Sequence, residues 1–209
     1  MYKFARYFLV LSAFSLALPL AHAAILGNGD TGPPSFLTPT GTLVASTSGM
    51  ISTVTFTASY NQWVYSDPGN TFCAGCLDFV YRFTNNGPDD LERFTGYSFA
   101  GFRVDAGFDP TSLGNPPLTV NRSISGAVVA FNYTGVDTVV PGQTTPLLVI
   151  ETDARSFTNG FVTAQDGNAG DAFAYAPATV PEPSSLALIG SGLLAAGGFW
   201  RRFAMGKRS

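Results

Sequence analysis

The sequence predicts an all-β domain that lies between two apolar terminal segments. Within residues 24–179, apolar and polar side chains alternate in short runs, for example where Leu77, Phe79 and Tyr81 are separated by other residues. Turn-forming sequences such as the Asp-Pro-Gly-Asn at 67–70 separate these runs. Alternation with a period of two is typical of strands that bury one face. We therefore expect an antiparallel β-sandwich, immunoglobulin-like or jelly-roll, flanked by an N-terminal signal helix and a C-terminal transmembrane helix.

Ten segments of the central region have strand character. The expected strands are 42–47, 54–60, 62–66, 77–83, 97–104, 118–125, 127–133, 147–151, 157–165 and 172–175. The Pro- and Gly-rich residues 27–39 and the Ala-Pro stretch 174–183 are expected to be arms or linkers. A regular βαβ alternation is missing, so a nucleotide-binding doubly wound sheet is not expected. The pattern does not reveal the order of the strands in the sheets.

The first 23 residues have the three parts of a secretory signal peptide. Lys3 and Arg6 give a positive start, residues 8–18 are apolar, and small residues stand at Ala21 and Ala23. We expect signal peptidase to recognise these two alanines and to cleave after Ala23. The alternative, a permanent membrane helix, is disfavoured because the apolar run is short for a bilayer.

Residues 180–209 combine three features in order. The first is the tetrapeptide Val180, Pro181, Glu182 and Pro183. The uncharged residues 184–200 follow, and Arg201 and Arg202 begin a basic tail at 201–209. As a helix, seventeen residues span about 25 Å, and snorkelling arginines extend this toward the bilayer core, so we expect a transmembrane helix at about 184–203. The positive-inside rule then places the tail in the cytoplasm and residues 24–179 across the membrane.

Together, these features resemble the PEP-CTERM sorting signal. The resemblance implies recognition by a membrane-embedded exosortase and processing near the Pro-Glu-Pro, in Gram-negative bacteria that make exopolysaccharide. The expected partners are signal peptidase, exosortase and the inner membrane, with exopolysaccharide as a further candidate. The expected route runs from a membrane-anchored precursor with a periplasmic ectodomain to the cell surface or extracellular matrix. The resemblance covers about thirty residues and leaves the ectodomain open; an ordinary tail anchor is the alternative.

The charge and histidine content of the ectodomain exclude several classes of function. Residues 24–179 contain five arginines, no lysine and thirteen carboxylates, a formal net charge of −8 that disfavours nucleic-acid binding. The sole histidine, His22, leaves with the signal peptide. Its loss removes Ser-His-Asp and Cys-His hydrolase mechanisms, and we expect no cofactor and no metal centre.

A pair of carboxylates is the remaining route to catalysis, as in glycoside hydrolases. Asp78 with Glu92 is one candidate pair, and Glu151 with Asp153 is the other. Their spacing in the sequence does not show that either pair meets across a cleft. Solvated surface charge is the favoured interpretation.

Cys73 and Cys76 are the only cysteines, and they are expected to form a local disulfide in an oxidising compartment. A thioredoxin-like redox role would need the motif to open a helix in a βαβ context. A zinc site would need two further ligands from elsewhere.

Two further groups are candidates for ligand binding. Asp166, Asn168 and Asp171 provide oxygen ligands between glycines, which suits calcium, although the segment lacks the full calcium-binding loop and a flexible turn is favoured. Trp63 and Tyr65 could stack on sugars if exposed.

The sequence thus predicts a protein without enzymatic activity that is exported and sorted to the cell surface or an exopolysaccharide matrix. A carbohydrate- or calcium-binding module is the alternative. A carboxylate-based glycan hydrolase is the third possibility.

Overall fold

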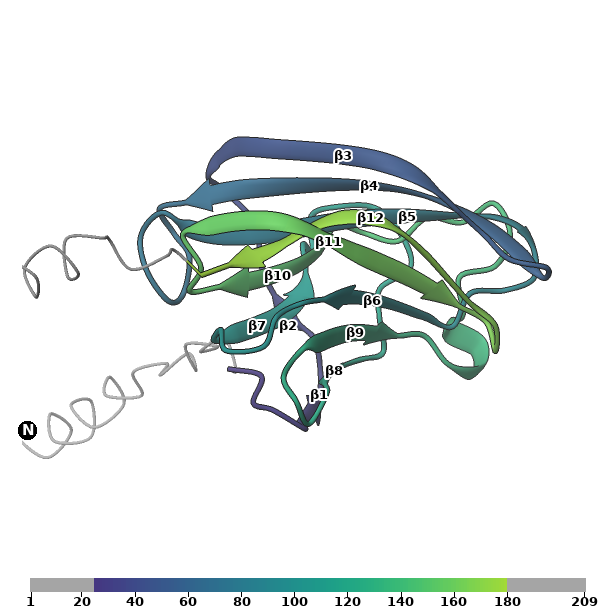
Figure 1. Cartoon of the computed structure of the whole chain (residues 1–209). Helices are drawn as coiled ribbons and strands as arrows, with labels where there is room; N and C mark the ends of the chain where they lie inside the picture. Colours follow the sequence, from purple (N-terminus) through teal and green to yellow (C-terminus); the bar gives the residue numbers. More distant parts are fainter. Residues whose placement is uncertain (1–24, 180–209) are drawn as a thin grey trace, which may run out of the picture.

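The computed structural model describes residues 25–179, which form twelve strands and one short 3-10 helix (Figure 1). The elements are β1 (Thr31–Gly32), β2 (Ser35–Phe36), β3 (Thr42–Ser52), β4 (Phe56–Asp67), β5 (Cys76–Pro88), β6 (Arg93–Tyr97), β7 (Val104–Phe108), β8 (Thr119–Arg122), β9 (Val128–Asn132), η1 (Gly135–Asp137), β10 (Leu148–Thr152), β11 (Ser156–Gln165) and β12 (Ala169–Ala178). Within residues 25–179, no helix is both long and apolar enough to cross a membrane. The expected signal helix and transmembrane helix lie outside the described residues.

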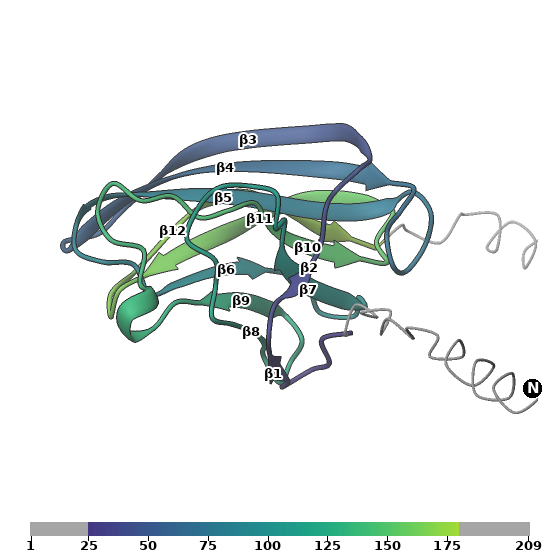
Figure 2. The same cartoon turned by 180° about the vertical axis from the view of Figure 1, so that it is seen from behind.

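The strands form two six-stranded sheets, which confirms the prediction of an all-β, mainly antiparallel domain. Sheet A has the order β1-β8-β9-β6-β11-β12, and sheet B has the order β2-β7-β10-β5-β4-β3. All neighbouring strands are antiparallel except the short pair β2 and β7. The two views in Figures 1 and 2 show the sheets as two layers of one body.

An aromatic core fills the space between the layers. Phe83 of β5 stacks on Phe94 of β6, with 4.1 Å between ring centroids, and Tyr133 meets Phe94 edge to face. Phe79 makes a similar edge contact with Phe99, which lies in the loop after β6. Side chains of both sheets belong to this single buried cluster. The alternation seen in the sequence therefore marks which face of each strand is buried.

Several predicted strand boundaries differ from the observed ones. The expected strands 54–60 and 62–66 are one strand, β4. The expected strand 97–104 is wrong, because residues 98–103 form a loop in which Ser98 and Gly101 adopt positive φ values of 71° and 85°. This loop follows β6, which was not predicted, and it directs Phe99 into the core. Buried aromatic residues thus gave a strand-like pattern to a loop.

The N-terminal arm predicted at residues 27–39 is instead docked on the domain. Residues 33–40, which include the second part of this arm, run from β7 across the outer face of sheet B to β4, and we call them the N-terminal strap. Leu37 of the strap is 5% exposed and packs with Val80 and Val149. The strap approaches β7 so closely that a Cβ at Gly107 would collide with the carbonyl group of Ser35, so glycine is required there.

The predicted C-terminal linker also begins too early, because β12 continues to Ala178 and buries Ala174 and Ala176. This strand is an edge of sheet A, and side chains of β4 in sheet B satisfy its backbone. The Tyr60 hydroxyl donates to the carbonyl oxygen of Phe173. Gln62 donates from Nε2 to the Tyr175 carbonyl oxygen at 2.7 Å, and its Oε1 accepts from the Tyr175 amide at 2.6 Å. These bonds join the two sheets along one side and cover an edge that could otherwise pair with another chain.

We expect Gln62→Ala to destabilise the domain by about 1–3 kcal/mol, because it removes a buried side chain and leaves the amide and carbonyl groups of the half-buried Tyr175 without these partners. Urea denaturation of this variant and of Asn61→Ala, which changes an exposed neighbour on the same strand, would measure the difference. Equal midpoints for the two variants would contradict this role of Gln62.

Candidate functional site

Four acidic residues lie together on the outer face of sheet B, and we call them the carboxylate row. They are Asp67, Asp78, Glu151 and Asp105. The strand register places Glu151 of β10 opposite Asp78 of β5 on one side and opposite Asp105 of β7 on the other. The four residues are between 0% and 6% exposed. Carboxylates so thoroughly buried need hydrogen-bond partners or a bound proton.

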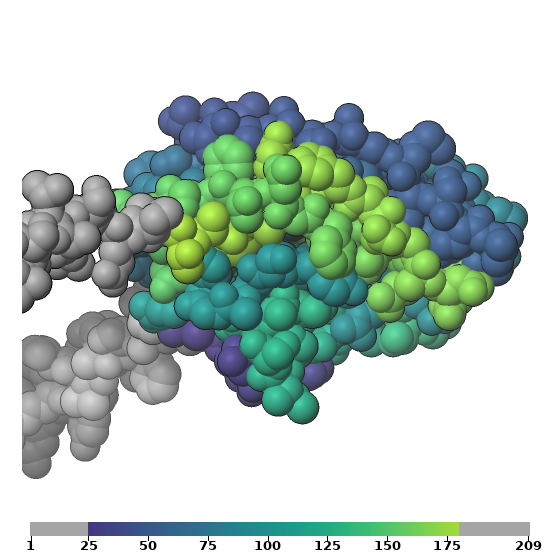
Figure 3. Space-filling view, viewed as in Figure 1, coloured from purple at the N-terminus to yellow at the C-terminus, as the bar shows by residue number. Residues whose placement is uncertain are grey.

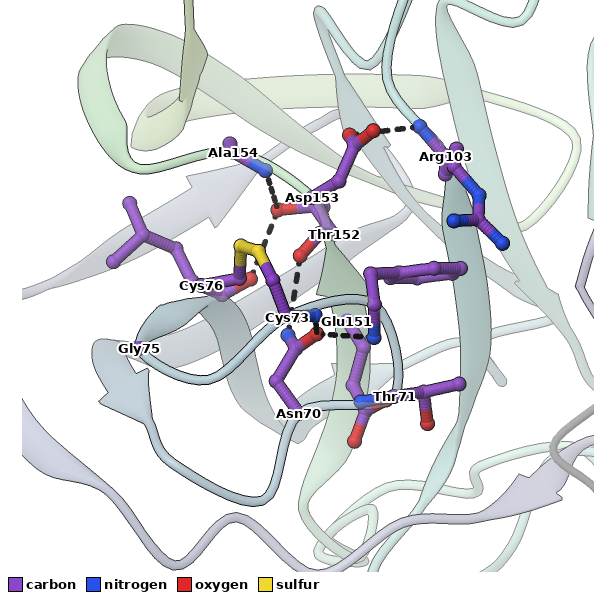
Figure 4. Close-up of a disulfide and its surroundings, with 12 residues drawn as sticks. Asn70, Thr71, Cys73, Gly75, Cys76, Arg103, Glu151, Thr152, Asp153 and Ala154 are labelled. Atoms are coloured by element: carbon purple, nitrogen blue, oxygen red, sulfur yellow. Dashed lines mark hydrogen bonds between the residues drawn. A yellow bond between two sulfur atoms is a disulfide. The ribbon is translucent and has the colours of Figure 1, made fainter.

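The loop between β4 and β5 covers one end of the carboxylate row. A disulfide joins Cys73 to Cys76 at the end of this loop, with a Cα–Cα distance of 5.3 Å (Figure 4). We call residues 68–76 the disulfide-closed loop, although the ring made by the disulfide spans only residues 73–76. Asn70 donates from Nδ2 to Asp78 Oδ1 at 2.7 Å and to the Thr152 carbonyl oxygen at 3.1 Å. The Thr71 amide donates to Glu151 Oε2 at 3.1 Å. The disulfide-closed loop therefore supplies the donors that hold two of the four carboxylates.

The N-terminal strap covers the rest of the row. Ser35 Oγ donates to Asp105 Oδ1 at 2.8 Å, and the Thr40 amide donates to Asp67 Oδ2 at 2.9 Å. The Thr40 hydroxyl adds a bond of 2.9 Å to Asp67 Oδ1. Strap and loop together enclose the row, and the row in turn holds both segments on the sheet.

The protonation states of the row differ because the surroundings differ. Burial raises the pKa of Asp78 to about 8, and the neighbouring Asp67 and Glu151 add to this rise. Burial also raises the pKa of Asp105 to about 6, assisted by the charge of Glu151. Burial acts on Asp67 in the same direction, but bonds from Thr40 and Gly69 outweigh it and lower the pKa of Asp67. At neutral pH Asp78 therefore retains its proton and Asp67 is ionised.

The difference in protonation between Asp78 and Asp67 accounts for Asp78 Oδ2, a buried oxygen that would otherwise lack a partner. Asp78 Oδ2 has no hydrogen-bond donor near it. Asp67 and Asp78 influence each other's protonation, because Asp67 raises the pKa of Asp78 and Asp78 lowers the pKa of Asp67. A protonated Asp78 is able to donate a hydrogen bond to the ionised Asp67, and we interpret the two residues as an acid pair that shares one proton. The acid pair links β4 to β5 beneath the disulfide-closed loop.

The structure separates Asp78 from Glu92, one of the two carboxylate pairs considered for glycan hydrolysis, and gives the carboxylates of the other pair different hydrogen-bond partners. Asp78 stands near the start of β5, whose far end at Pro88 lies about 33 Å away along the strand, and Glu92 follows beyond that end. Glu151 is bound by Thr71, whereas Asp153 accepts from the amide of Arg103 at 2.9 Å (Figure 4). Glu151 instead meets Asp78 and Asp105, a grouping that depends on strand register and was not predicted.

The candidate calcium residues lie at the hairpin between β11 and β12. Asp166 Oδ1 accepts from the Asn168 amide at 2.9 Å, and the Asn168 side chain donates to Thr55 Oγ1 at 3.3 Å. Asp171 is an exposed residue of β12 opposite Thr163. In residues 25–179, no group of three or more His, Cys, Asp or Glu side chains is arranged to hold a metal ion.

The candidate sugar-binding aromatics are not free surface rings. Trp63 and Tyr65 are half-buried on the outer face of sheet B. Both pack against the small cluster that Leu37 of the strap forms with Val80 and Val149. Their alternation is explained by this second, smaller core.

Comparison with known proteins identifies the C-terminal segment and not the domain. Residues 179–202 match the family model of the PEP-CTERM protein-sorting motif. This motif implies exosortase-dependent sorting of an exported, membrane-passing protein. The chain is consistent with a PEP-CTERM protein, as the sequence predicted. The motif residues Val180, Pro181, Glu182, Pro183, Arg201 and Arg202 lie outside the described residues, as do Ala21 and Ala23 of the expected cleavage site. Searches of curated proteins and of solved structures give no match.

We expect Asp78→Asn to make the domain more stable above pH 7. The pKa of Asp78 rises from 3.8 to about 8 on folding, so its contribution to stability is full below about pH 4 and is lost as the pH rises through 8. Asparagine has the shape of the protonated acid and can still donate to Asp67. At pH 8 the variant should exceed the wild type by more than about 1 kcal/mol in unfolding free energy, and the gain should vanish near pH 4.

Denaturant titrations at pH 4, 6 and 8 would measure these differences. Asp171→Asn, at an exposed position of β12, is the matched control and should leave the pH profile unchanged. An Asp78→Asn variant that loses stability at every pH would disprove the shared proton.

Removal of the disulfide by the double change Cys73→Ala and Cys76→Ala should cost about 2 kcal/mol, because a closed loop of only four residues restricts the unfolded chain weakly. The comparison requires the oxidised wild type and the variant in the same urea titration. A loss above about 5 kcal/mol would show that the disulfide does more than shape this loop.

Proposed function

We propose that the chain is a non-enzymatic protein that is exported, held in the inner membrane by its C-terminal segment, and processed by exosortase for the cell surface or an exopolysaccharide matrix. The sorting motif at residues 179–202 is the observation that carries this proposal. It begins directly after β12, which ends at Ala178. A folded β domain that is joined to a sorting signal without a long spacer suits a protein in which the β domain is the part that is delivered.

The topology follows from the charges at the two ends. Lys3 and Arg6 precede one apolar run, and Arg201 and Arg202 follow the other. Both sets of cations are retained on the cytoplasmic side, so residues 24–179 are placed in the periplasm, as a β-sandwich, after signal peptidase cleaves behind Ala23.

The carboxylate row supports a structural role for the acidic residues and gives no support to a hydrolase. A glycoside hydrolase needs two carboxyl groups that face a substrate across a cleft. Asp78, Asp105 and Glu151 are instead buried and accept bonds from Asn70, Ser35 and Thr71 of the same chain. The bonds that they accept fix the strap and the loop on the sheet.

We expect deletion of residues 180–209 to release the domain into the periplasm or the medium, because it removes both the apolar run and the basic tail. Cell fractionation and immunoblotting would compare the deletion with the full chain. The double change Cys73→Ala and Cys76→Ala is the control, since it alters the domain and should leave the protein with the membranes. A deleted chain that still sediments with the inner membrane would contradict the proposal.

A further inference from the structure

Five aromatic side chains lie on the outer face of sheet A, and we call this surface the aromatic face. They are Tyr97 of β6, Phe157 and Phe161 of β11, and Phe173 and Tyr175 of β12. The register places Phe161 opposite Phe173 and Asn159 opposite Tyr175, so the rings share one side of the hairpin. The three phenylalanines are 36%, 43% and 45% exposed. Figure 3 shows β11 and β12 open to the viewer across this side of the domain.

The rings form a continuous, ordered surface. Tyr97 stacks on Phe161 with 4.3 Å between centroids. Tyr175 meets Phe157 at 5.1 Å and Phe173 at 5.4 Å, both edge to face. Burying these rings would remove apolar surface from water, and contiguous exposed patches of this kind mark interaction sites.

The position of the aromatic face relative to the sorting motif indicates what covers it. β12, which carries two of the rings, ends at Ala178. The uncharged apolar run begins at Ser184, so only residues 179–183 intervene. Five residues reach at most about 18 Å when fully extended. While the apolar run is in the bilayer, the C-terminal end of this strand is therefore held close to the membrane surface.

The composition of the aromatic face also suits a bilayer surface. Tyrosine combines an apolar ring with a polar hydroxyl and is typical of membrane interfaces, while the phenylalanines supply apolar area that a bilayer can bury. The exposed Arg155 precedes β11 at the end where β12 leaves, because Ser156 pairs with Ala178. A guanidinium group at this border can bind lipid phosphate.

We propose that the aromatic face rests on the lipid headgroup and acyl boundary of the membrane for as long as the C-terminal segment anchors the chain. This inference depends on the proposed function, because the tether supplies the proximity. A patch of five rings by itself binds a membrane weakly. Because the C-terminal segment anchors the chain nearby, contact between the patch and the membrane becomes intramolecular, and the effective concentration of the patch at the membrane is high. Processing near the Pro-Glu-Pro would remove the tether, and the domain would then leave the surface.

The test uses the full chain with Trp200→Phe, reconstituted into vesicles of phosphatidylcholine and phosphatidylglycerol with brominated acyl chains, which quench nearby tryptophan. Phe161→Trp places a reporter on the aromatic face. Val136→Trp places one at a residue of η1 that is 98% exposed, and it is the matched control. Trp63 is common to both variants, so its emission is subtracted with the parent chain.

We expect the Phe161→Trp reporter to lose about half of its emission in brominated vesicles and the Val136→Trp reporter to lose little. Phe173→Trp, on the opposite strand, should repeat the result. Small, equal losses at positions 136, 161 and 173 in chains that float with the vesicles would overturn the inference alone. The inference would also be overturned if brominated lipid did not quench the tryptophan reporter and a soluble polysaccharide or a second copy of the chain covered it instead. Chains that fail to float would overturn the proposed function together with it.

Discussion

The stack of Phe83 on Phe94 is the contact on which the rest of the domain depends. These rings belong to central strands of different sheets, and their contact at 4.1 Å fixes the face of each sheet that is buried. Once β5 and β6 are set in this way, Phe79, Phe99 and Tyr133 fill the space around them. Alternation then sends the other set of side chains outward, which places the carboxylate row on sheet B and the aromatic face on sheet A.

Local sequence patterns predicted the all-β class of the fold, but they did not predict how the two sheets are joined or how the strap docks on them. The alternation of Leu77, Phe79 and Tyr81 identified β5, because apolar residues at every second position lie on the buried face of a strand. The loop at 98–103 was misjudged because Phe99 is buried without being in a strand. The bonds of Gln62 to Tyr175 join residues 113 positions apart, and no local pattern records such a partner. The sequence of residues 27–39 does not predict the strap, because proline and glycine suit both an extended linker and a docked segment.

The same limit applies to the site. The Cys73 and Cys76 pair could be predicted from compartment and spacing alone, and the PEP-CTERM signal from the order of its three features. The carboxylate row could not, because Asp78, Glu151 and Asp105 become neighbours only through the registers of β5, β10 and β7. One sign was nonetheless present in the sequence: all three interrupt strands that are otherwise rich in apolar residues. Acidic side chains in such positions need protons or donors, and the strap and loop provide the donors.

The closing role of β12 has a consequence for the passage of the chain through the inner membrane. The strand supplies Ala174 and Ala176 to the core, and its edge is completed by Tyr60 and Gln62 from the first half of the domain. Until residue 178 has emerged from the secretion channel, one side of the aromatic core stays open to water. For a chain exported as we propose, the domain therefore cannot finish folding before residue 178 has been translocated, and its contacts between distant residues favour slow folding. Because the last strand is needed to complete the core, the polypeptide remains unfolded during most of its translocation and reaches its stable fold only near the end of that process.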